Sequence, residues 1–511
     1  MARVRYRSSG SFERLICSLV SVLLLVHPAA AGSPTVEVYL WFDTEDYILP
    51  EADGAALRLA RWLTERGIRG TFKLVGEKAR VLEQRGREDV IQALKKHDIG
   101  FHTNFHSVQP TPALYLSYTN WDEGVREFLR REGPGVRDVA RIFGMHPSCY
   151  GQPGSSWGPQ QFGAMKRWGI PVYLDAGNHV SLNGNPFWYC GILNLYALKG
   201  TTRTGLQSAE QLRVAKKEFE RLYNELLEEG GGPISIVYHP CEFVHAKFWD
   251  GVNFSRGANP PRERWVVPPK KSPEEIETAF RIFQEYVAFI QAHERVRFAT
   301  ARDAVHIYPD HALGRHFRHD ELLSLARDVE KKGVTYAVLG DDVSLSAAET
   351  MYLLCQAYVG RLEGRQELEA KLDFSPLGPT SNGPKHDRIG TDGSQFNRTC
   401  TDVLSFIRYH RRIPAAVWLG STPCTPESFL VALATILARD RLPEPDETIT
   451  LRRVGFPLAK HVRDDEPGLW GWVIFPPGFH SPHVMQLAKW QAWTLKPALR
   501  DNDAAAALPR R

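Results

Sequence analysis

Little cysteine and little net charge mark this sequence. It has seven cysteines in 511 residues, and no two of them form a CxxC spacing, so a cysteine-bound metal knuckle is not indicated. The 63 basic residues nearly balance the 59 acidic ones, and no basic block stands apart from its acidic neighbours, which argues against a nucleic-acid-binding protein. A hydrophobic fraction of 43% beside 24% charged residues excludes a globally disordered chain and predicts a large buried core.

Long apolar runs are missing except at the start of the chain. Three arginines among the first seven residues precede an apolar run at residues 15–26, and alanines at residues 29–31 follow it. This pattern predicts a secretory signal peptide over residues 1–31, because the run is shorter than the roughly 20 residues that an uncleaved membrane anchor needs. We therefore expect a secreted or cell-envelope protein with no membrane span in the mature chain. In an exported protein some of the six remaining cysteines could form disulfides.

Short β-branched or aromatic runs alternate with helical patterns over residues 32–310. The predicted strands are residues 36–42, 70–75, 99–101, 149–150, 172–174, 234–238 and 296–298. The predicted helices are residues 55–66, 81–96, 160–168, 209–229 and 273–293. About seven strand–helix units favour an α/β fold, a distorted (β/α) barrel, over the alternative of an open doubly wound sheet.

A mainly helical pattern occupies residues 311–511. Residues 322–327 are echoed about 80 positions later by residues 403–408, and Leu339-Gly340 recurs as Leu419-Gly420. Each copy leads into an apolar helix, predicted at residues 347–358 and 426–437, and residues 375–394 between them read as a long loop. We expect a duplicated helix–turn–helix unit of about 80 residues, with the start of a third copy at Ser481. Two unrelated helical hairpins that look alike are the alternative.

Ionisable side chains follow four of the predicted strands directly. These are Asp43, Glu45 and Asp46 after the first, His102 and His106 after the third, Asp175 after the fifth, and His239 after a late strand. In a parallel barrel the carboxyl ends of all strands open onto one face, so these segments would converge on one cleft.

The pair of histidines four residues apart suggests a metal site. If the segment forms one helical turn, both imidazoles lie on one face and can reach one ion. Catalytic zinc commonly has three protein ligands, so Glu45 or Asp46 would supply the third, and alternation along an extended strand favours Glu45. A solvated histidine pair and a helix-capping acidic cluster are the alternatives.

Taken together, these residues resemble the motifs of the polysaccharide deacetylases of carbohydrate esterase family four, the NodB-homology group. The motifs are Asp43 to Asp46, His102-Thr103-Asn104-Phe105-His106, and Tyr238-His239-Pro240, and the resemblance covers residues 36–309. It implies a hydrolase that removes N-acetyl groups from a polysaccharide with one divalent ion, expected to be Zn²⁺. The implied ligands are His102, His106 and Glu45 or Asp46; Asp43 would be the general base, His239 the acid, and Asp175 the residue that holds His239.

The third motif departs from the family pattern. Where the family has an arginine that steadies the basic aspartate, this chain has Gly151, so either the amide of Gln152 replaces it or the site works differently. The backbone near Gly154 could supply an N–H group to an oxyanion. Trp188 and Trp249 lie in predicted loops beside the site and could contact a sugar ring, although ordinary packing is the alternative.

Two functions other than deacetylation stay open. The missing arginine is compatible with a carbohydrate-binding protein that has lost turnover, and the same barrel could cut other bonds. Residues 403–437 weakly resemble pseudomurein-binding repeats, which implies attachment to a cell-envelope polymer, with a purely structural role as the alternative.

Overall fold

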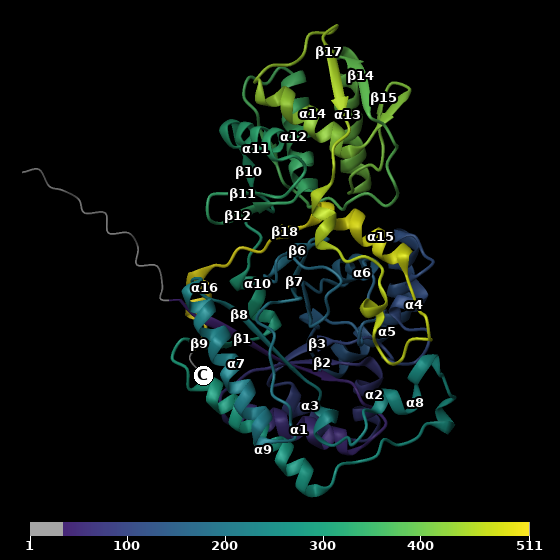
Figure 1. Cartoon of the computed structure of the whole chain (residues 1–511), viewed down its shortest axis with the longest axis vertical. Helices are drawn as coiled ribbons and strands as arrows, with labels where there is room; N and C mark the ends of the chain where they lie inside the picture. Colours follow the sequence, from purple (N-terminus) through teal and green to yellow (C-terminus); the bar gives the residue numbers. More distant parts are fainter. Residues whose placement is uncertain (1–33, 510–511) are drawn as a thin grey trace, which may run out of the picture.

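The computed structural model describes residues 34–509, so the predicted signal peptide lies outside the described residues. A curled α/β barrel occupies the lower half of the molecule in Figure 1, and a mainly helical region lies above it. Six cysteines fall within the described range, and all six are buried free thiols, so no disulfide forms there. Among residues 34–509, no helix combines the length and the apolar character that crossing a bilayer requires.

Eight parallel strands form the barrel wall. They are β1 (Val36–Thr44), β2 (Thr71–Leu74), β3 (Asp98–Phe101), β4 (Cys149–Tyr150), β5 (Val172–Asp175), β7 (Ile192–Tyr196), β8 (Gly232–Tyr238) and β9 (Val296–Ala299). The antiparallel strands β6 (Phe187–Tyr189) and β18 (Lys496–Pro497) extend one edge. The other edge, β8, meets the chain beyond β7 through an isolated bridge between Thr201 and Ser235.

The predicted barrel is therefore confirmed as an incompletely closed α/β barrel, but the predicted number of strands was too small. All seven predicted strands are present, and β6, β7 and β18 were missed. The sequence of β7, Ile-Leu-Asn-Leu-Tyr, places a polar Asn194 in the middle of the run, and β18 comes from a segment nearly 300 residues further along the chain.

Strand β1 is paired with other strands along both of its edges. All nine of its residues are buried, as expected for a parallel strand covered on both faces. Strand β8 runs along one edge, while β9 pairs with Val36–Tyr39 and β2 with Trp41–Thr44 on the other. The carboxyl end of β1, with Asp43 and the acidic cluster after it, is thereby held between β2 and β8.

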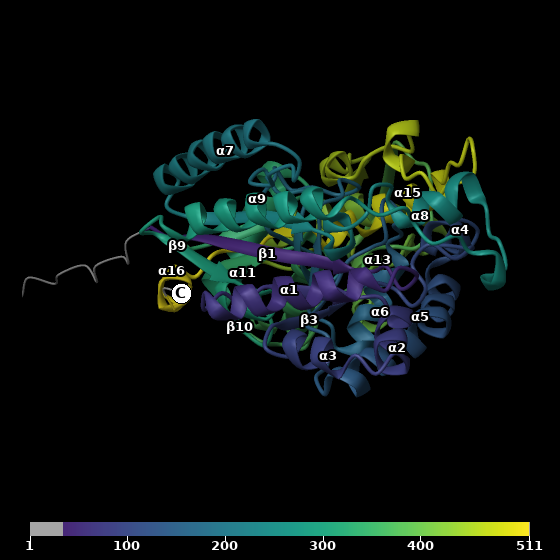
Figure 2. The same cartoon turned by 90° about the horizontal axis from the view of Figure 1, so that it is seen from below.

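Helices cover the outer surface of the barrel. They are α1 (Glu51–Glu65), α2 (Gly76–Gln84), α3 (Glu88–Leu94), α4 (Pro112–Leu116), α5 (Trp121–Phe143), α6 (Gln160–Trp168), α7 (Ala209–Glu228), α9 (Pro273–Gln291) and α10 (Ala301–Ile307). Figure 2 shows α1 and α9 on opposite sides of β1. The longest helix, α5, was not predicted, because Gly124, Gly133, Pro134 and Gly135 interrupt its helical pattern. Gly135 has a structural reason, since a Cβ there would lie 2.9 Å from the Cα of Asn104.

The helical region contains two segments with the same order of elements. The first is β10 (His316–Phe317), α11 (His319–Lys332), the hairpin β11 (Ala337–Leu339) and β12 (Val343–Leu345), α12 (Ala347–Leu362) and β13 (Ala370–Lys371). The second is β14 (Arg388–Asp392), α13 (Gly393–His410), the hairpin β15 (Val417–Leu419) and β16 (Thr422–Cys424), α14 (Pro426–Ala438) and β17 (Thr448–Arg452). In each segment the outer strands pair antiparallel, and the predicted turn is a β-hairpin. Their origin by duplication stays a prediction.

The last part of the chain returns to the barrel. Residues 457–509 include α15 (Pro482–Gln491) and β18, which joins the barrel sheet beside β6. The buried Lys496 ammonium bonds Asp310 at the end of the barrel and Glu349 on α12, and so ties the two regions together. The predicted third copy at Ser481 differs from the other two, because α15 leads into β18 rather than into a hairpin and a second helix.

Candidate metal centre and active-site cleft

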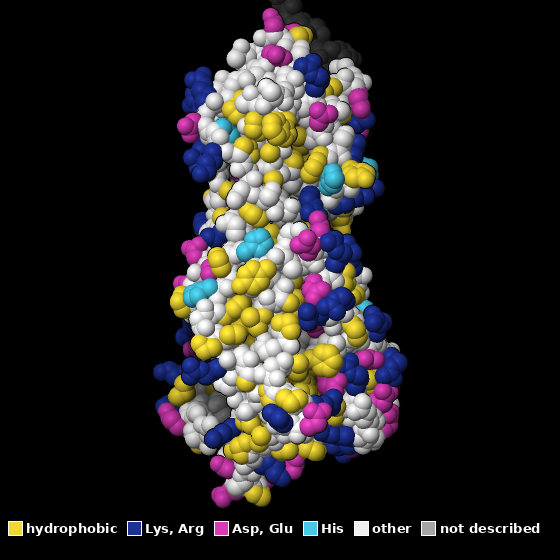
Figure 3. Space-filling model, turned by 90° about the vertical axis from the view of Figure 1, so that its right-hand side faces the viewer, with side chains coloured by type: hydrophobic (Ala, Val, Ile, Leu, Met, Phe, Trp, Pro, Cys, Tyr) yellow, Lys and Arg dark blue, Asp and Glu magenta, His cyan; other side chains and the backbone are white. Residues whose placement is uncertain are grey.

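A cavity of about 450 Å³ lies at the carboxyl ends of the barrel strands. Of the predicted site residues it is lined by Asp43, Glu45, His102, His106, Gln152, Gly154, Asp175 and His239. Strand β1 points toward the right-hand side of the molecule in Figure 2, and Figure 3 shows that side. Apolar side chains there form a broken band down the middle, with charged side chains mostly at its margins. Four segments that are distant in sequence therefore do converge on one cleft.

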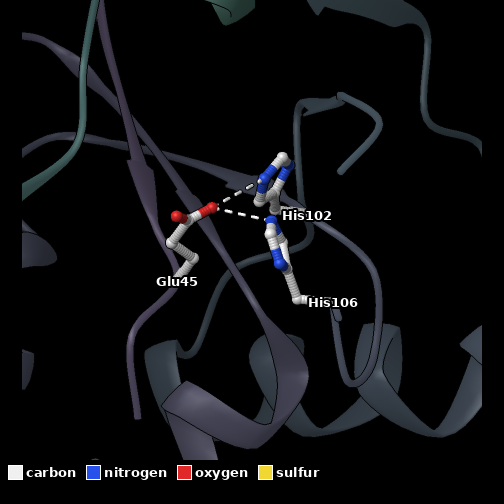
Figure 4. Close-up of side chains that lie close together, drawn as sticks. All are labelled: Glu45, His102 and His106. Carbon is white, nitrogen blue, oxygen red and sulfur yellow. Dashed lines mark ion pairs between the residues drawn. The ribbon is translucent and has the colours of Figure 1, made fainter. Parts of the chain in front are cut away.

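Glu45, His102 and His106 form a compact group of possible metal ligands (Figure 4). Glu45 Oε2 lies 2.7 Å from His106 Nε2 and 3.4 Å from His102 Nε2. One ligand atom from each residue lies within 4.8 Å of the other two, and all three side chains are buried. This is a span that one cation can bridge.

The two histidines reach this position through a turn, not through the helical turn that the spacing suggested. His102 follows β3 directly, and Thr103 and His106 adopt left-handed backbone conformations, with φ of 63° and 57°. Such conformations are costly for residues with a Cβ and gather at functional sites. Helix α5 supports the turn from outside, because the buried Glu132 carboxylate accepts a hydrogen bond from Asn104 N at 2.6 Å.

Hydrogen bonds on the far side of each side chain fix the orientation of the group. His102 Nδ1 lies 2.9 Å from the carbonyl oxygen of Gly151, and His106 Nδ1 lies 2.7 Å from Ser107 Oγ. Trp249 Nε1 donates to Glu45 Oε1 at 2.9 Å, which leaves Oε2 facing the imidazoles. Two Nε2 atoms and one carboxylate oxygen, each held from behind, are a donor set that fits catalytic zinc.

Asp46, the alternative third ligand, faces away from the histidine pair. Its Oδ1 accepts hydrogen bonds from the backbone N–H groups of Ile48 and Leu49, and its Oδ2 lies 2.8 Å from His245 Nε2. Because the chain turns after Glu45, Asp46 caps the turn into α1, and Glu45 is the residue that faces the imidazoles.

Asp43 is paired with a buried lysine that sequence reasoning missed. Lys73 on β2 has a fully buried side chain, and its Nζ lies 2.9 Å from Asp43 Oδ1 and 3.2 Å from Asp175 Oδ2. It also donates to the carbonyl oxygen of Leu174 and lies 4.1 Å from the ring centre of Trp41. Burial alone would lower the pKa of Lys73, but the carboxylates of Asp43 and Asp175 outweigh it and raise the pKa.

Lys73 occupies the space that a side chain at position 151 would need. A Cβ on Gly151 would lie 2.0 Å from Lys73 Nζ and 2.8 Å from Asp175 Oδ2. The cation beside Asp43 therefore comes from β2, and the glycine in the third motif makes room for it. Gln152 does not take this role, because its amide donates to the Gly154 carbonyl and accepts from Tyr173 and Tyr196.

His239 is held by Glu242 and Asp43 and not by Asp175. Its Nε2 lies 3.7 Å from Asp43 Oδ2, and its Nδ1 lies 3.8 Å from Glu242 Oε1. Burial alone would lower the pKa of His239, but the carboxylates of Glu45, Glu242 and Asp43 raise it to about 9. Within residues 34–509, the partners of the Asp175 carboxylate are Lys73 and the N–H groups of Ala176 and Gly177, so Glu242 and not Asp175 contacts the His239 ring.

Trp188 and Trp249, the two aromatic residues that were predicted to contact a sugar ring, do not line the cavity. Trp188 lies on β6, where it pairs with Lys496 of β18, and it does not line the cavity. Trp249 begins the short helix α8 (Trp249–Asn253), is fully buried and orients Glu45. The aromatic lining comes instead from Trp41 on β1, from Phe248 and from Trp472, which belongs to the C-terminal region.

Comparisons with known proteins give distant structural likenesses. No family model matches the chain, and no curated protein matches it by sequence. Similar solved structures include an allantoinase (15% identity, 55% of this chain and 92% of that chain, TM-score 0.34). They also include a probable polysaccharide deacetylase from Pseudomonas aeruginosa PAO1 (14% identity, 54% of this chain and 91% of that chain, TM-score 0.35). A family 4 carbohydrate esterase from Streptomyces lividans in complex with acetate is a third (11% identity, 50% of this chain and 88% of that chain, TM-score 0.25).

These TM-scores lie below 0.5, so the likenesses decide neither the family nor the activity of this chain. The resemblance of residues 403–437 to pseudomurein-binding repeats gains no support, since no family model matches.

Proposed function

We propose that the protein is a metal-dependent hydrolase that removes N-acetyl groups from a polysaccharide. The observation that carries this proposal is the set of groups around one cavity: a Glu–His–His ligand set, the carboxylate Asp43 and the imidazole His239. Asp43 Oδ1 lies 3.5 Å from His102 Nδ1, and its Oδ2 faces His239 Nε2. A base, an acid and a cation site thus lie within one small volume.

The residues of the chain can divide the work of amide hydrolysis among them. A divalent ion held by Glu45, His102 and His106 would supply an electrophile for the acyl carbonyl oxygen. Asp43 accepts a proton from water as the water oxygen bonds to the acyl carbon. His239 donates a proton to the amine nitrogen as the carbon–nitrogen bond breaks, and the products are a carboxylic acid and a free amine.

The charges around His239 suit the donor role. With its pKa raised to about 9, His239 carries a proton at neutral pH. Glu242 accepts a hydrogen bond from the His239 backbone N–H and pairs with Arg203, and its pKa falls to about 2, because His239 and Arg203 outweigh its burial. An imidazolium held between two carboxylates is available for protonating a leaving amine.

The absence of an arginine in the third motif is not an argument for a binding protein without catalytic activity. That reading depended on the absence of a cation beside Asp43, and Lys73 Nζ lies 2.9 Å from this carboxylate. The presence of this cation favours the catalytic hypothesis.

The test is acetate release from chitin oligomers and peptidoglycan by the zinc-loaded protein. Asp43→Asn is expected to lower the rate by about a hundredfold or more, since general acid–base groups contribute about 10²–10⁴. His102→Ala is expected to lower the rate strongly as well, because it removes one of the three predicted metal ligands. His311→Ala and Asp341→Asn, which change exposed residues outside the cavity, are matched controls and should keep the wild-type rate. No acetate from either polymer, or full activity of His102→Ala, would refute the proposal.

We also propose that the protein works outside the cell or in the envelope, as the predicted signal peptide suggests. Contact of the helical region with an envelope polymer belongs to the same proposal. Co-sedimentation of the full chain with purified peptidoglycan, compared with Trp418→Ala in the exposed hairpin β15–β16, tests it. If both proteins are retained equally, or if neither is retained, Trp418 does not bind the envelope polymer.

A further inference from the structure

The C-terminal region contributes one side of the active-site cavity. Residues 456–480, called here the crossing segment, lie across the loops that follow the barrel strands, and yellow ribbon runs down beside α15 at the right of Figure 1. Within this segment, Trp472 and Val473 line the cavity together with Phe248 and the predicted ligands.

The crossing segment is fixed to four separate barrel loops. Its backbone carbonyls at Val473 and Ile474 accept hydrogen bonds from Arg256 and Gly257, in the loop after β8. Ile474 also accepts from the side chain of Gln109, in the loop after β3. Trp472 N donates to Ser155 Oγ in the loop after β4, and residues 461–463 bond residues 179–181 after β5. The segment is thus built into the mouth of the barrel.

The indole of Trp472 is held in one orientation. Its Nε1 donates to Asp250 Oδ2 at 2.9 Å, and Asp250 is itself buried. One side of the ring lies against Gly154, where a Cβ would approach the indole to 2.4 Å. Gly154 also has a φ of +51°, so the position favours glycine twice over. A ring fixed in this way loses little freedom when a ligand packs against it.

Two aromatic side chains flank the reacting groups. Trp472 meets the imidazole of His106 edge-on, with ring centres 5.3 Å apart, and Phe248 meets His239 in the same way at 5.2 Å. Val473, which is 49% exposed, continues the apolar surface beside Trp472. A cavity with carboxylates and imidazoles at its centre and apolar walls matches a sugar ring, which has hydroxyls at its edge and C–H groups on its faces.

We propose that Trp472 and Val473 form a substrate-binding wall, against which the sugar ring that carries the acyl group packs. This inference rests on the proposed function, because the wall would hold the acyl group of that ring next to Asp43 and His239. The crossing segment is then a determinant of specificity, although it lies more than 150 residues beyond β9, the last of the parallel barrel strands.

The experiment is calorimetric titration with tetra-N-acetylchitotetraose and with acetylated xylotetraose. An Asp43→Asn parent keeps the ligand set but removes the base, so that the probe is not consumed. In this parent, Trp472→Ala should weaken binding about three- to tenfold, the range expected for the loss of one ring contact. Trp472→Phe, which keeps a ring, should recover most of this loss, and Val473→Ser should weaken binding about twofold.

Tyr118→Ala is the matched control, because Tyr118 is an aromatic residue that is 94% exposed and does not line the cavity. It should bind the probe like the parent. If Trp472→Ala fails to fold, Trp472→Phe and Val473→Ser carry the test, and wild-type-like binding by both would overturn the inference. It is also overturned if the folded Trp472→Ala binds like the parent, or if the parent binds neither probe. If the wild-type protein releases no acetate but binding of the probe still depends on Trp472, the proposed deacetylation is refuted and the proposed binding role of Trp472 is retained.

Discussion

Replacing Lys73 by methionine is the most direct test of the charge arrangement beneath the cavity. The lysine side chain is fully buried, and its ammonium is shared by Asp43 and Asp175, which are nearly as deeply buried. Methionine fills similar volume but leaves both carboxylates without a cation. Removing one partner of a buried ion pair costs about 3–5 kcal/mol of the free energy of unfolding, because the remaining charge stays buried and uncompensated.

The measurement is urea unfolding in a buffer with a chelator, so that bound metal does not add to the stability of the folded state. Lys332→Met is the matched control, because Lys332 pairs with Asp328 at 2.7 Å on the exposed surface of α11, where such a pair contributes about 0.5 kcal/mol or less. Adding Asp175→Asn to Lys73→Met should recover part of the loss, since it removes one of the two unpaired charges.

A loss below about 1 kcal/mol for Lys73→Met would refute the reasoning, because it would mean that the two carboxylates do not need the ammonium. With Zn²⁺ restored, the same variant should also release acetate more slowly, since Asp43 loses the group that fixes its Oδ1. A variant that is unstable yet fully active would separate the structural role of Lys73 from its proposed positioning role.

Three further results are expected. Gly151→Ala should lower both the free energy of unfolding and the rate of acetate release, because its Cβ would lie 2.0 Å from Lys73 Nζ. Gly390→Ala, which has open space around it, should change neither quantity. Equal behaviour of the two variants in unfolding and activity assays would contradict this expectation. Burial raises the pKa of Glu132 to about 7 from its usual 4.5, so its contribution to stability is complete below about pH 4.5 and is lost as the pH rises through 7. Glu132→Gln should remove about 3 kcal/mol of that pH dependence, measured by urea unfolding between pH 4.5 and 8.5, and an unchanged slope would count against it. Added Zn²⁺ should raise the melting temperature of the wild type but not that of His106→Ala, and an equal rise in both would place the ion elsewhere.

Much of the barrel could be predicted because its strands are apolar and short, with helices between them. All seven predicted strands are present, and α6 begins and ends at the predicted residues. Helix α5 was missed because its local sequence does not favour a helix. Its glycines and Pro134 lower helix propensity locally, yet packing against the turn that carries His102 and His106 stabilises it, as the Gly135–Asn104 approach shows.

The site was predictable where a side chain follows a strand end in its own segment. Asp43, Glu45, His102, His106 and His239 all line the cavity, as the convergence of parallel strands requires. Glu242 could have been found, because it lies three residues after His239 at the start of a turn. Trp472 and Asp250 could not have been found in this way, because nothing in their local sequence points to the cavity. Trp472 also lies more than 150 residues beyond β9, the last of the parallel barrel strands.

Lys73 also carries a local signal in the sequence. A lysine in the run Thr-Phe-Lys-Leu, between apolar neighbours in a parallel strand, must be buried, and a buried lysine needs carboxylate partners. The absence of an arginine in the third motif is the complementary signal, because two cations cannot both fit beside Asp43 when a single Cβ at position 151 already meets Lys73 Nζ. The two positions therefore constrain each other: restoring the motif with Gly151→Arg alone should inactivate the protein, and only a smaller residue at position 73 could make room for the guanidinium.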